Sequence, residues 1–376
     1  MKKTKIIIAS ILKPIDDTRM FEKLGLSLAK TNKYEVNIIG FISKNTLAHD
    51  SIHFYPHGPF QRTSLLRLMS CWKVFNIYIK VKPDIIICNT HELLIVTSLY
   101  RILFGAKIIY DIRENYVKNI QHTNVFNPML KPFLMAYVRT KELLAQPFFH
   151  GFMLAERIYA HQLGFVPQNK SVMIENKYFG IGRQLKPIMP FHKKEVTLLF
   201  SGTISDSNGV FDAIRITEQL HALDSSIKLK IIGYCALKRD LLRLQASVED
   251  KEFIELIGGD YLVPHDLIVE EIKKADFGFV LKKPNKGIND DKLLTRLFEY
   301  TANQLPILLL ENPTWVRFCH EFNAAITVNP DQVNAQEILQ RMKTTDFYTK
   351  GDTNNSLWQS EENKFLDFIS EFNTHF

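Results

Sequence analysis

The chain has 376 residues, of which 46% are hydrophobic and 23% charged, and its formal net charge is +7. These values exclude a disordered or low-complexity chain, and the length fits two domains of moderate size. The charge is uneven, because residues 1–165 contain 22 Lys and Arg against 11 Asp and Glu, whereas the remaining residues contain 25 against 29. A basic first half predicts an anionic partner, such as a membrane surface or a phosphorylated carrier. No motif typical of nucleic-acid-binding domains is present, so we expect no nucleic acid as a partner.

The cysteines and the N-terminal residues indicate a reduced, cytoplasmic protein. Cys71, Cys88, Cys235 and Cys319 lie far apart, with neither a CxxC pair nor a metal-ligand spacing. Such thiols are usually reduced and buried. The apolar run after Lys3 imitates a signal peptide, but charged residues follow it without a cleavage site, so we interpret it as a first strand. No apolar run reaches the ~18–20 residues that span a bilayer.

The first half of the chain alternates strands and helices. Strands are expected at 5–9, 36–39, 84–88, 107–110 and 148–154, and helices at 18–31, 92–104 and 155–162. Strand, helix and strand at this spacing form a βαβ unit and imply a parallel sheet. The turn after the first strand lacks a GxGxxG string, so we do not expect a dinucleotide site.

Two features of the first half suggest binding surfaces. Asp111, Arg113 and Glu114 follow the fourth strand, and open α/β sheets bind ligands at the carboxyl ends of their strands. The alternative for this cluster is a turn that caps a helix. Residues 60–82 and 126–149 are both basic and apolar. They fit either a surface that docks on anionic lipid or long core helices with solvated basic faces.

The same alternation restarts after the irregular stretch at 177–194, which is the best linker candidate. Strands are expected at 196–200, 228–232, 253–256, 277–281 and 307–310, helices at 210–223 and 267–274, and a last amphipathic helix at 356–373. We therefore predict two consecutive βα-repeating domains, at 1–170 and 171–350, with a cleft between them, and a closing segment at 351–376.

The most informative stretch is a predicted helix in the second domain. Asn289 is a good N-cap, and the two acids that follow it suit the first turn of a helix. An apolar stripe packs inward, while the other face carries Asp291, Arg296 and Glu299. This polar face is either solvated surface, with an ion pair between Arg296 and Glu299, or the place where the chemistry occurs.

Several short strings of residues follow one another along nearly the whole chain. The most specific is Thr295-Arg296-Leu297-Phe298-Glu299-Tyr300, followed by Leu305-Pro306. The others are Asp16-Asp17-Thr18-Arg19, Tyr110-Asp111-Ile112-Arg113-Glu114, Leu154-Ala155-Glu156, Ile174-Glu175-Asn176, Phe200-Ser201-Gly202-Thr203, Asn208-Gly209-Val210 and Ala275-Asp276-Phe277-Gly278. In order and spacing, these strings resemble the retaining glycosyltransferases of the GT-B fold, in particular family 4 of the bacterial sugar transferases.

The resemblance implies an architecture and an activity. The architecture has two Rossmann-like, doubly wound parallel-sheet domains, the first on the acceptor side and the second for the donor, with a C-terminal helix that crosses back onto the first. The activity is transfer of a sugar, with retention, from a nucleotide-sugar donor to a lipid-linked or polysaccharide acceptor. Synthesis of a bacterial surface glycan, such as lipopolysaccharide or capsule, at the inner face of the membrane would be its setting. Neither a cofactor nor a metal is implied.

The resemblance also assigns roles to residues of the donor site. The family's Glu-x7-Glu motif corresponds to Asp291-x7-Glu299, with the shorter acid first. Glu299 would bind the ribose hydroxyls, Asp291 would lie near the sugar hydroxyls, and Arg296 would neutralise the diphosphate. Backbone N–H groups of the helix start, at about Lys292–Leu294, would face the diphosphate. The remaining residues expected in the donor site are Gly202, Thr203, Gly233, Tyr261 and Lys282.

Three further positions depart from the family pattern. Thr203 and Asn208 stand where the family has a phosphate-binding Arg and Lys, so Lys282 or Lys283 would help to neutralise the diphosphate. Arg113 stands where the family has a His near the acceptor, and it would contact an anionic group.

Three functions are compatible with these features. Glycosyl transfer is the one that we favour. A nucleotide-sugar 2-epimerase would share the fold but convert its donor without an acceptor. A non-catalytic, nucleotide-sugar-binding subunit is suggested by the missing Arg and Lys.

Overall fold

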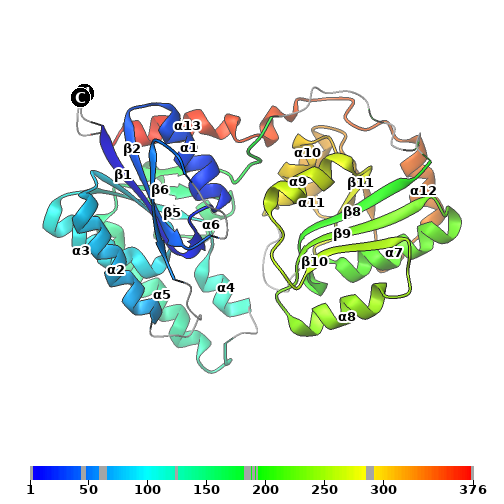
Figure 1. Ribbon diagram of the computed structural model, residues 1–376, viewed down its shortest axis with the longest axis horizontal. Helices are drawn as coiled ribbons and strands as arrows, with labels where there is room; N and C mark the ends of the chain where they lie inside the picture. Colours follow the sequence, from blue (N-terminus) through cyan, green and yellow to red (C-terminus); the bar gives the residue numbers. More distant parts are fainter. Residues whose placement is uncertain are drawn as a thin grey trace. The chain divides into compact units, whose positions relative to one another are not determined.

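The computed structural model describes residues 3–43, 48–58, 66–122, 126–181, 188, 191, 194–284 and 292–373. The chain divides into two compact units, the first made of Met1–Phe179 with Trp358–Phe376 and the second of Gly180–Leu357. Each unit contains one parallel sheet flanked by helices (Figure 1). The predicted α/β class with two doubly wound sheets is therefore confirmed.

The first sheet has seven strands in the order β3-β2-β1-β4-β5-β6-β7, all parallel. The strands are β1 Thr4–Pro14, β2 Tyr34–Phe41, β3 Ile52–His57, β4 Ile85–Cys88, β5 Lys107–Ile112, β6 Gly151–Leu154 and β7 Ser171–Met173. The direction of winding reverses between β1 and β4, so the loops that follow these two strands diverge at their carboxyl ends. Open α/β sheets bind ligands at such a point.

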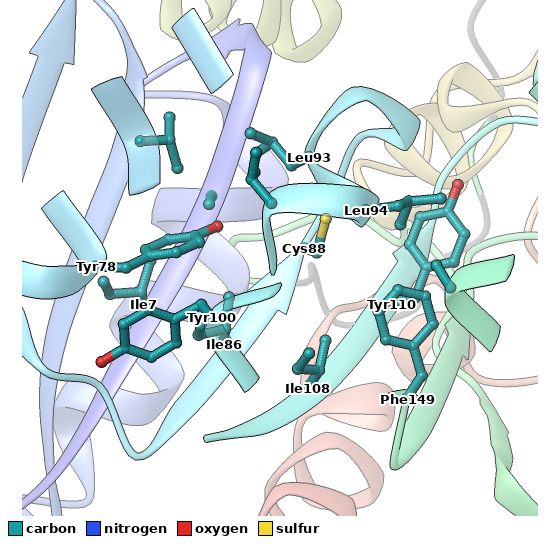
Figure 2. Packing of buried hydrophobic residues seen from close by; sticks show 14 of the residues in the cluster. Ile7, Tyr78, Ile86, Cys88, Leu93, Leu94, Tyr100, Ile108, Tyr110 and Phe149 are labelled. Carbon is teal, nitrogen blue, oxygen red and sulfur yellow. The ribbon is translucent and has the colours of Figure 1, made fainter. Parts of the chain in front are cut away.

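Helices bury both faces of this sheet. One face is covered by α2 (Leu66–Val81), α3 (Leu94–Phe104) and α5 (Lys131–Ala145). Figure 2 shows Ile7, Ile86 and Ile108, from three neighbouring strands, gathered with Tyr78 and Tyr100 of these helices. The π-helix η1 (Thr18–Gly25), α1 (Leu26–Lys30) and α13 (Gln359–Ser370) cover the other face. Burial on both sides explains why the strands read as continuous apolar runs.

The second sheet has six parallel strands in the order β10-β9-β8-β11-β12-β13. They are β8 Val196–Thr203, β9 Ile227–Tyr234, β10 Ile254–Gly259, β11 Phe277–Val280, β12 Ile307–Leu310 and β13 Ala325–Val328. Its helices are α7 Val210–Leu223, α8 Lys238–Val248, α9 His265–Lys274, α10 Thr295–Ala302, α11 Pro313–His320 and α12 Ala335–Thr344. Helix α7 contacts α12, and α10 contacts both α9 and α11.

The C-terminal helix belongs to the first unit, as predicted. Trp358, at its start, is fully buried, and its Nε1 donates to Ser27 Oγ at 2.9 Å. Glu361 is also buried, and its carboxylate pairs with Lys177 Nζ at 2.7 Å. The chain thus leaves the first unit after Phe179 and returns to it at Trp358.

The structure differs from the sequence prediction in several elements. The boundary predicted at residue 170 leaves β7 in the second domain, yet β7 pairs with β6 in the first sheet. The helix expected at 18–31 begins as a π-helix. The sequence did not predict β3, α4 (Tyr116–His122), α8, α11, β13 and α12, and the helix expected at 155–162 is shortened to α6 (Tyr159–Gln162). Among the described residues, no helix is long and apolar enough to cross a membrane. The cleft between the domains stays a prediction.

Candidate functional site

Three glycines stand side by side at the carboxyl edge of the second sheet. Gly202 of β8 is in register with Gly233 of β9, which is in register with Gly258 of β10. Their φ angles are 92°, 151° and 89°, in the region that favours glycine. A Cβ on Gly233 would lie 1.7 Å from the carbonyl oxygen of Gly202, and a Cβ on Gly258 would lie 2.3 Å from that of Gly233. Only glycine fits at these two positions, and the row leaves bare backbone at this edge.

The start of α7 lies against the same edge. Gly209, which precedes α7, has a φ of 82°, and a Cβ there would lie 2.3 Å from the carbonyl oxygen of Leu281. Asn208 Nδ2 donates to the backbone oxygen of Thr203 at 3.0 Å. Thr203 and Asn208, which stand where the family has an Arg and a Lys, therefore belong to one turn. Neither supplies a positive charge.

Glu299 of α10 is held by a histidine that the sequence did not predict as a site residue. His265 Nε2 lies 3.0 Å from Glu299 Oε1, and the Glu299 side chain is 13% exposed. His265 is the first residue of α9, which contacts α10. This hydrogen bond uses one carboxylate oxygen and fixes the direction of the group. Its only sequence signal is the position of His265 after a strand of the second sheet.

Arg296 does not pair with Glu299, which removes the ordinary surface interpretation of this helix face. Its guanidinium carbon lies 4.6 Å from the centre of the Phe200 ring, and Nη1 donates to the Phe279 oxygen at 3.4 Å. Nη2 lies 3.4 Å from the place where a Cβ of Gly202 would be. Among the described residues, no carboxylate neutralises Arg296. A positive charge therefore stands beside the first glycine of the row.

Helix α10 is anchored by buried polar contacts. Tyr300 is fully buried, and its hydroxyl lies 2.9 Å from Ser201 Oγ at the end of β8. A Cβ on Gly278 would lie 2.3 Å from the Tyr300 ring, so β11 needs glycine there. Thr301 Oγ1 lies 2.6 Å from Ser356 Oγ, so α10 contacts the 3-10 helix Thr353–Ser356. These contacts fix the rotation of α10 and hence the directions of Arg296 and Glu299.

The start of α10 corrects the sequence prediction. The helix begins at Thr295, five residues later than predicted, and the segment before it is extended. Lys292 accepts a hydrogen bond on its backbone oxygen from Trp315 Nε1 at 2.9 Å, and Leu293 is buried. The free backbone N–H groups of a helix start therefore begin at Thr295 and not at Lys292–Leu294. Asp291 lies outside the described residues.

One of the two lysines after β11, Lys283, differs from expectation. Lys283 Nζ pairs with Asp206 at 2.9 Å and with Asp212 at 3.1 Å. Burial lowers the pKa of Lys283, but hydrogen bonds to these two acids outweigh it and raise the pKa overall. Lys283 is thus already neutralised. Lys282 is half-buried, and Tyr261 is exposed beyond β10. Among the described residues, no cluster of His, Cys, Asp and Glu is suited to a metal ion.

In the first unit, two similar strings form crossed ion pairs. Arg113 binds Asp17 through both terminal nitrogens, at 2.7 and 3.1 Å. Arg19, which is fully buried, binds Asp111 at 2.7 Å. Burial would raise the pKa of Asp17, but the Arg113 charge outweighs it and lowers that pKa to about 2. Arg113 was predicted to contact an anionic group, and in this structure Asp17 occupies that position.

A buried charged cluster follows β4, at the reversal point of the first sheet. Glu92 pairs with Arg67 and, at 3.1 Å, with His91 Nε2, while Lys141 Nζ lies 3.0 Å from His91 Nδ1. Burial raises the pKa of Glu92, but its hydrogen bond to His91 and its positive neighbours lower it overall, to about 2. Burial raises the pKa of the neighbouring Glu142 to about 7. Sequence reasoning missed this cluster because its members come from three separate segments.

Comparisons with known proteins establish the fold. No protein-family model matches the sequence, and no curated protein matches it. Sucrose-phosphate synthase from Thermosynechococcus elongatus shares 12% identity with a TM-score of 0.68, over 98% of this chain and 99% of that one. HepE from Anabaena, in a complex with UDP, shares 13% identity with a TM-score of 0.61, over 98% and 100% of the two chains.

A third similar structure comes from Listeria monocytogenes and is described as a UDP-N-acetylglucosamine 2-epimerase. It shares 12% identity with a TM-score of 0.60, over 98% of this chain and 96% of that one. All three likenesses extend over nearly the whole of both chains. Together with the two doubly wound parallel sheets and the C-terminal helix that returns to the first unit, they show that the chain has the GT-B fold.

Proposed function

We propose that the protein is a retaining glycosyltransferase that moves a sugar from a nucleotide-sugar donor to a lipid-linked or polysaccharide acceptor. The setting would be the synthesis of a bacterial surface glycan, such as lipopolysaccharide or capsule, on the cytoplasmic side of the inner membrane. The observation that carries this proposal is the placement of Glu299. Its carboxylate is oriented by His265 on a helix beside the glycine row of the second sheet.

The chemistry of a nucleotide diphosphate fits this edge of the second unit. A carboxylate accepts hydrogen bonds from the two hydroxyls of a ribose, and Glu299 has one oxygen beyond the His265 contact. Bare backbone at Gly202 and Gly233 allows a ligand to approach closely. Arg296, which no described carboxylate neutralises, supplies positive charge for the diphosphate. Stabilisation of the leaving diphosphate by this cation and by backbone N–H groups would need no metal.

The names of similar proteins agree with this proposal. HepE was determined with UDP and with UDP-glucose, and sucrose-phosphate synthase and trehalose 6-phosphate synthase share its fold. A donor that carries a uridine nucleotide is therefore the first to test. In the proposed mechanism Asp291 lies near the sugar hydroxyls of the donor. Arg113 reaches an anionic acceptor group only if Asp17 gives up its bidentate pair.

The decisive experiment is the substitution Glu299→Gln with titration of UDP, GDP, ADP and dTDP sugars. Loss of a charge-assisted hydrogen bond to ribose should weaken donor binding by about 10- to 150-fold. Turnover with acceptor extracts should fall with it. Glu270→Gln, an exposed position on α9 that makes the same change of charge, is the matched control. Unchanged donor affinity and turnover in a folded Glu299→Gln protein would contradict the proposal.

A nucleotide-sugar 2-epimerase is the second candidate, because a protein described as such an enzyme shares the fold. Incubation of the protein with its donor alone distinguishes the two activities. A transferase leaves the donor sugar unchanged until an acceptor is added, whereas an epimerase converts it without one. A non-catalytic subunit would bind the donor in the titration and leave it unchanged with every acceptor.

A further inference from the structure

One surface of the first unit exposes an unusual amount of apolar side chain. Among the described residues, 22 large apolar side chains are exposed, and 13 of them lie on α2, α3, α5 and the turn before α5. These three helices lie side by side on one face of the first sheet (Figure 1). In a folded protein, a large exposed apolar surface of this kind marks a site of interaction with a partner or a membrane.

The exposed residues form stripes along single helix faces. On α5, Phe133, Tyr137, Leu143 and Leu144 are 52–75% exposed and follow the spacing of one helical face. Ala136 and Thr140 complete that face, which contains no charge. These side chains are not part of the core of the unit, whose α5 contribution comes from the opposite face of the helix.

Helix α3 repeats the pattern. Ile95, Ile102 and Leu103 are 46–61% exposed, at i, i+7 and i+8, with half-buried Leu99 between them. Helix α2 carries Met69, Trp72 and Ile79 on its exposed face, interspersed with Lys73 and Lys80. We call the surface made by these faces of α2, α3 and α5 the basic-apolar face.

Charge indicates what covers this face. Its exposed bases are Lys73 and Lys80, and the one acid on the three helices, Glu142, is buried. Two copies of the chain meeting through this face would bring bases against bases, which disfavours a symmetric dimer. Apolar stripes along helix faces do not suit nucleic acid, whose backbone offers phosphates. An anionic bilayer offers both negative headgroups for the lysines and hydrocarbon for the stripes.

We infer that the basic-apolar face docks in the plane of an anionic lipid bilayer. Leu103, Leu143 and Leu144 enter the boundary between headgroups and acyl chains, while Lys73 and Lys80 remain among the headgroups. This mode of attachment needs no spanning helix. It deepens the proposed function by giving a transferase access to a lipid-linked acceptor, but lipid binding itself requires neither a donor nor a reaction.

Sedimentation of the full chain with vesicles tests the inference. One set of vesicles contains phosphatidylcholine alone, and the other contains equal parts of phosphatidylcholine and phosphatidylglycerol. We expect the protein to sediment with the anionic set and to remain in solution with the neutral set. Added salt should weaken the binding because the lysine contribution is screened. Absence of binding to the anionic vesicles, or equal binding to both sets, would overturn the inference.

Variants in matched pairs distinguish lipid binding through the basic-apolar face from non-specific adsorption to vesicles. Leu103→Asp with Leu144→Asp should abolish sedimentation, and both positions are exposed enough to accept the change without unfolding. Leu242→Asp on α8 is the matched control, because Leu242 is 57% exposed in the second unit and should leave binding intact. Lys73→Ala with Lys80→Ala should weaken partition about 30-fold, or by about a factor of five for each lysine.

Binding of a second copy of the chain to this face would give a different result with the same variants. If the face instead binds a second copy, light scattering will show a dimer that the aspartate pair dissociates, and neither vesicle set will retain the protein. That outcome would overturn the inference while leaving the proposed glycosyl transfer untouched. Conversely, vesicle binding without any donor turnover would count against the transfer alone.

Discussion

At the scale of single residues, two ion pairs of the first unit join strings that are distant in sequence. Asp17 and Arg113 pair, as do Arg19 and Asp111, so the two matching strings after β1 and β5 hold each other. Removing one partner of a buried pair leaves an uncompensated charge and typically costs about 3–5 kcal/mol. The sequence identified the string after β5 as a candidate ligand-binding cluster, and the string after β1 only as part of the family resemblance. Their mutual pairing depends on the neighbouring places of β1, β4 and β5 in the sheet, which no local pattern encodes.

Glu142 gives a pH-dependent prediction at this scale. Burial raises its pKa to about 7, against the opposing effects of Arg139 and Tyr110. The folded state therefore holds the proton more tightly than the unfolded chain, and this contribution is complete below about pH 4.3 and lost as the pH rises through about 7. We expect the unfolding free energy of the natural protein to fall relative to Glu142→Gln, by roughly 3 kcal/mol between these limits.

Urea unfolding of the two proteins at several pH values measures this difference. The comparison with Glu142→Gln cancels the contributions of other titrating groups, such as His91 and His150, whose pKa values are lowered by burial. A difference that does not change with pH would show that Glu142 titrates near its ordinary value.

The proposed donor site was predictable to a similar, limited extent. The strings around Gly202, Arg296 and Glu299 were found in the sequence because each residue lies next to a strand or helix with a clear apolar pattern. His265 was not found, since a lone histidine at a helix start carries no signal until the helix is placed beside α10. The same is true of the cluster around Glu92, whose residues are distant in sequence.

At the scale of secondary-structure elements, the glycine row makes the carboxyl edge of the second sheet unusually intolerant of change. Strands β8, β9 and β10 approach one another so closely there that a methyl group on Gly233 has no space. The sequence marked Gly202 and Gly233 as strand ends, but the need for glycine at both arises from their register.

Gly233→Ala should therefore destabilise the second unit and weaken donor binding together. The added Cβ lies 1.7 Å from the Gly202 oxygen, so the backbone of β8 or β9 must shift, and we expect a loss of at least about 2 kcal/mol. Thermal unfolding and donor titration measure the two effects. Gly164→Ala, where a Cβ meets no atom within 4 Å, is the control and should change neither. Normal donor affinity in Gly233→Ala would show that the glycine row is not part of the proposed donor site.

The prediction of elements succeeded where apolar runs were long and failed where tertiary contacts determine the structure. The bounds of α7 and β12 agree with the sequence prediction, because their apolar patterns end at clear turn signals. Short strands such as β3 and β13 lie at sheet edges and lack a long buried run. Helix α10 begins late because Trp315 binds the backbone of Lys292 in an extended segment, an interaction that helix propensity does not include.

At the scale of the whole molecule, the two ends of the chain meet in one unit. Trp358, Phe365 and Ile369 are buried with Met20 and Leu24 against the first sheet. Helix α12 lies between the last strand of the second unit, β13, and the helix that completes the first unit, α13. The core of the first unit is incomplete until Trp358, Phe365 and Ile369 have been synthesised. This return was predicted from the apolar spacing and the family resemblance, although the partners of Trp358 were not.

Two tryptophans allow the stability of each unit to be tested separately. Trp358→Ala removes a fully buried side chain and its hydrogen bond to Ser27 from the first unit, while Trp315→Ala removes a comparable one from the second. Each substitution should cost about 3–5 kcal/mol, because a large side chain leaves a cavity. Hydrogen exchange followed by mass spectrometry resolves where protection is lost.

We expect Trp358→Ala to lower protection in β1, β2 and β4 while β8, β11 and β12 keep theirs, and Trp315→Ala to give the reverse. The reason is that each tryptophan contacts the core of its own unit, and the chain connects the units through the short segments around residues 180 and 357. Loss of protection in both units with either variant would show that they unfold as one cooperative body. In that case the C-terminal helix would stabilise the second unit as well as the unit that it completes.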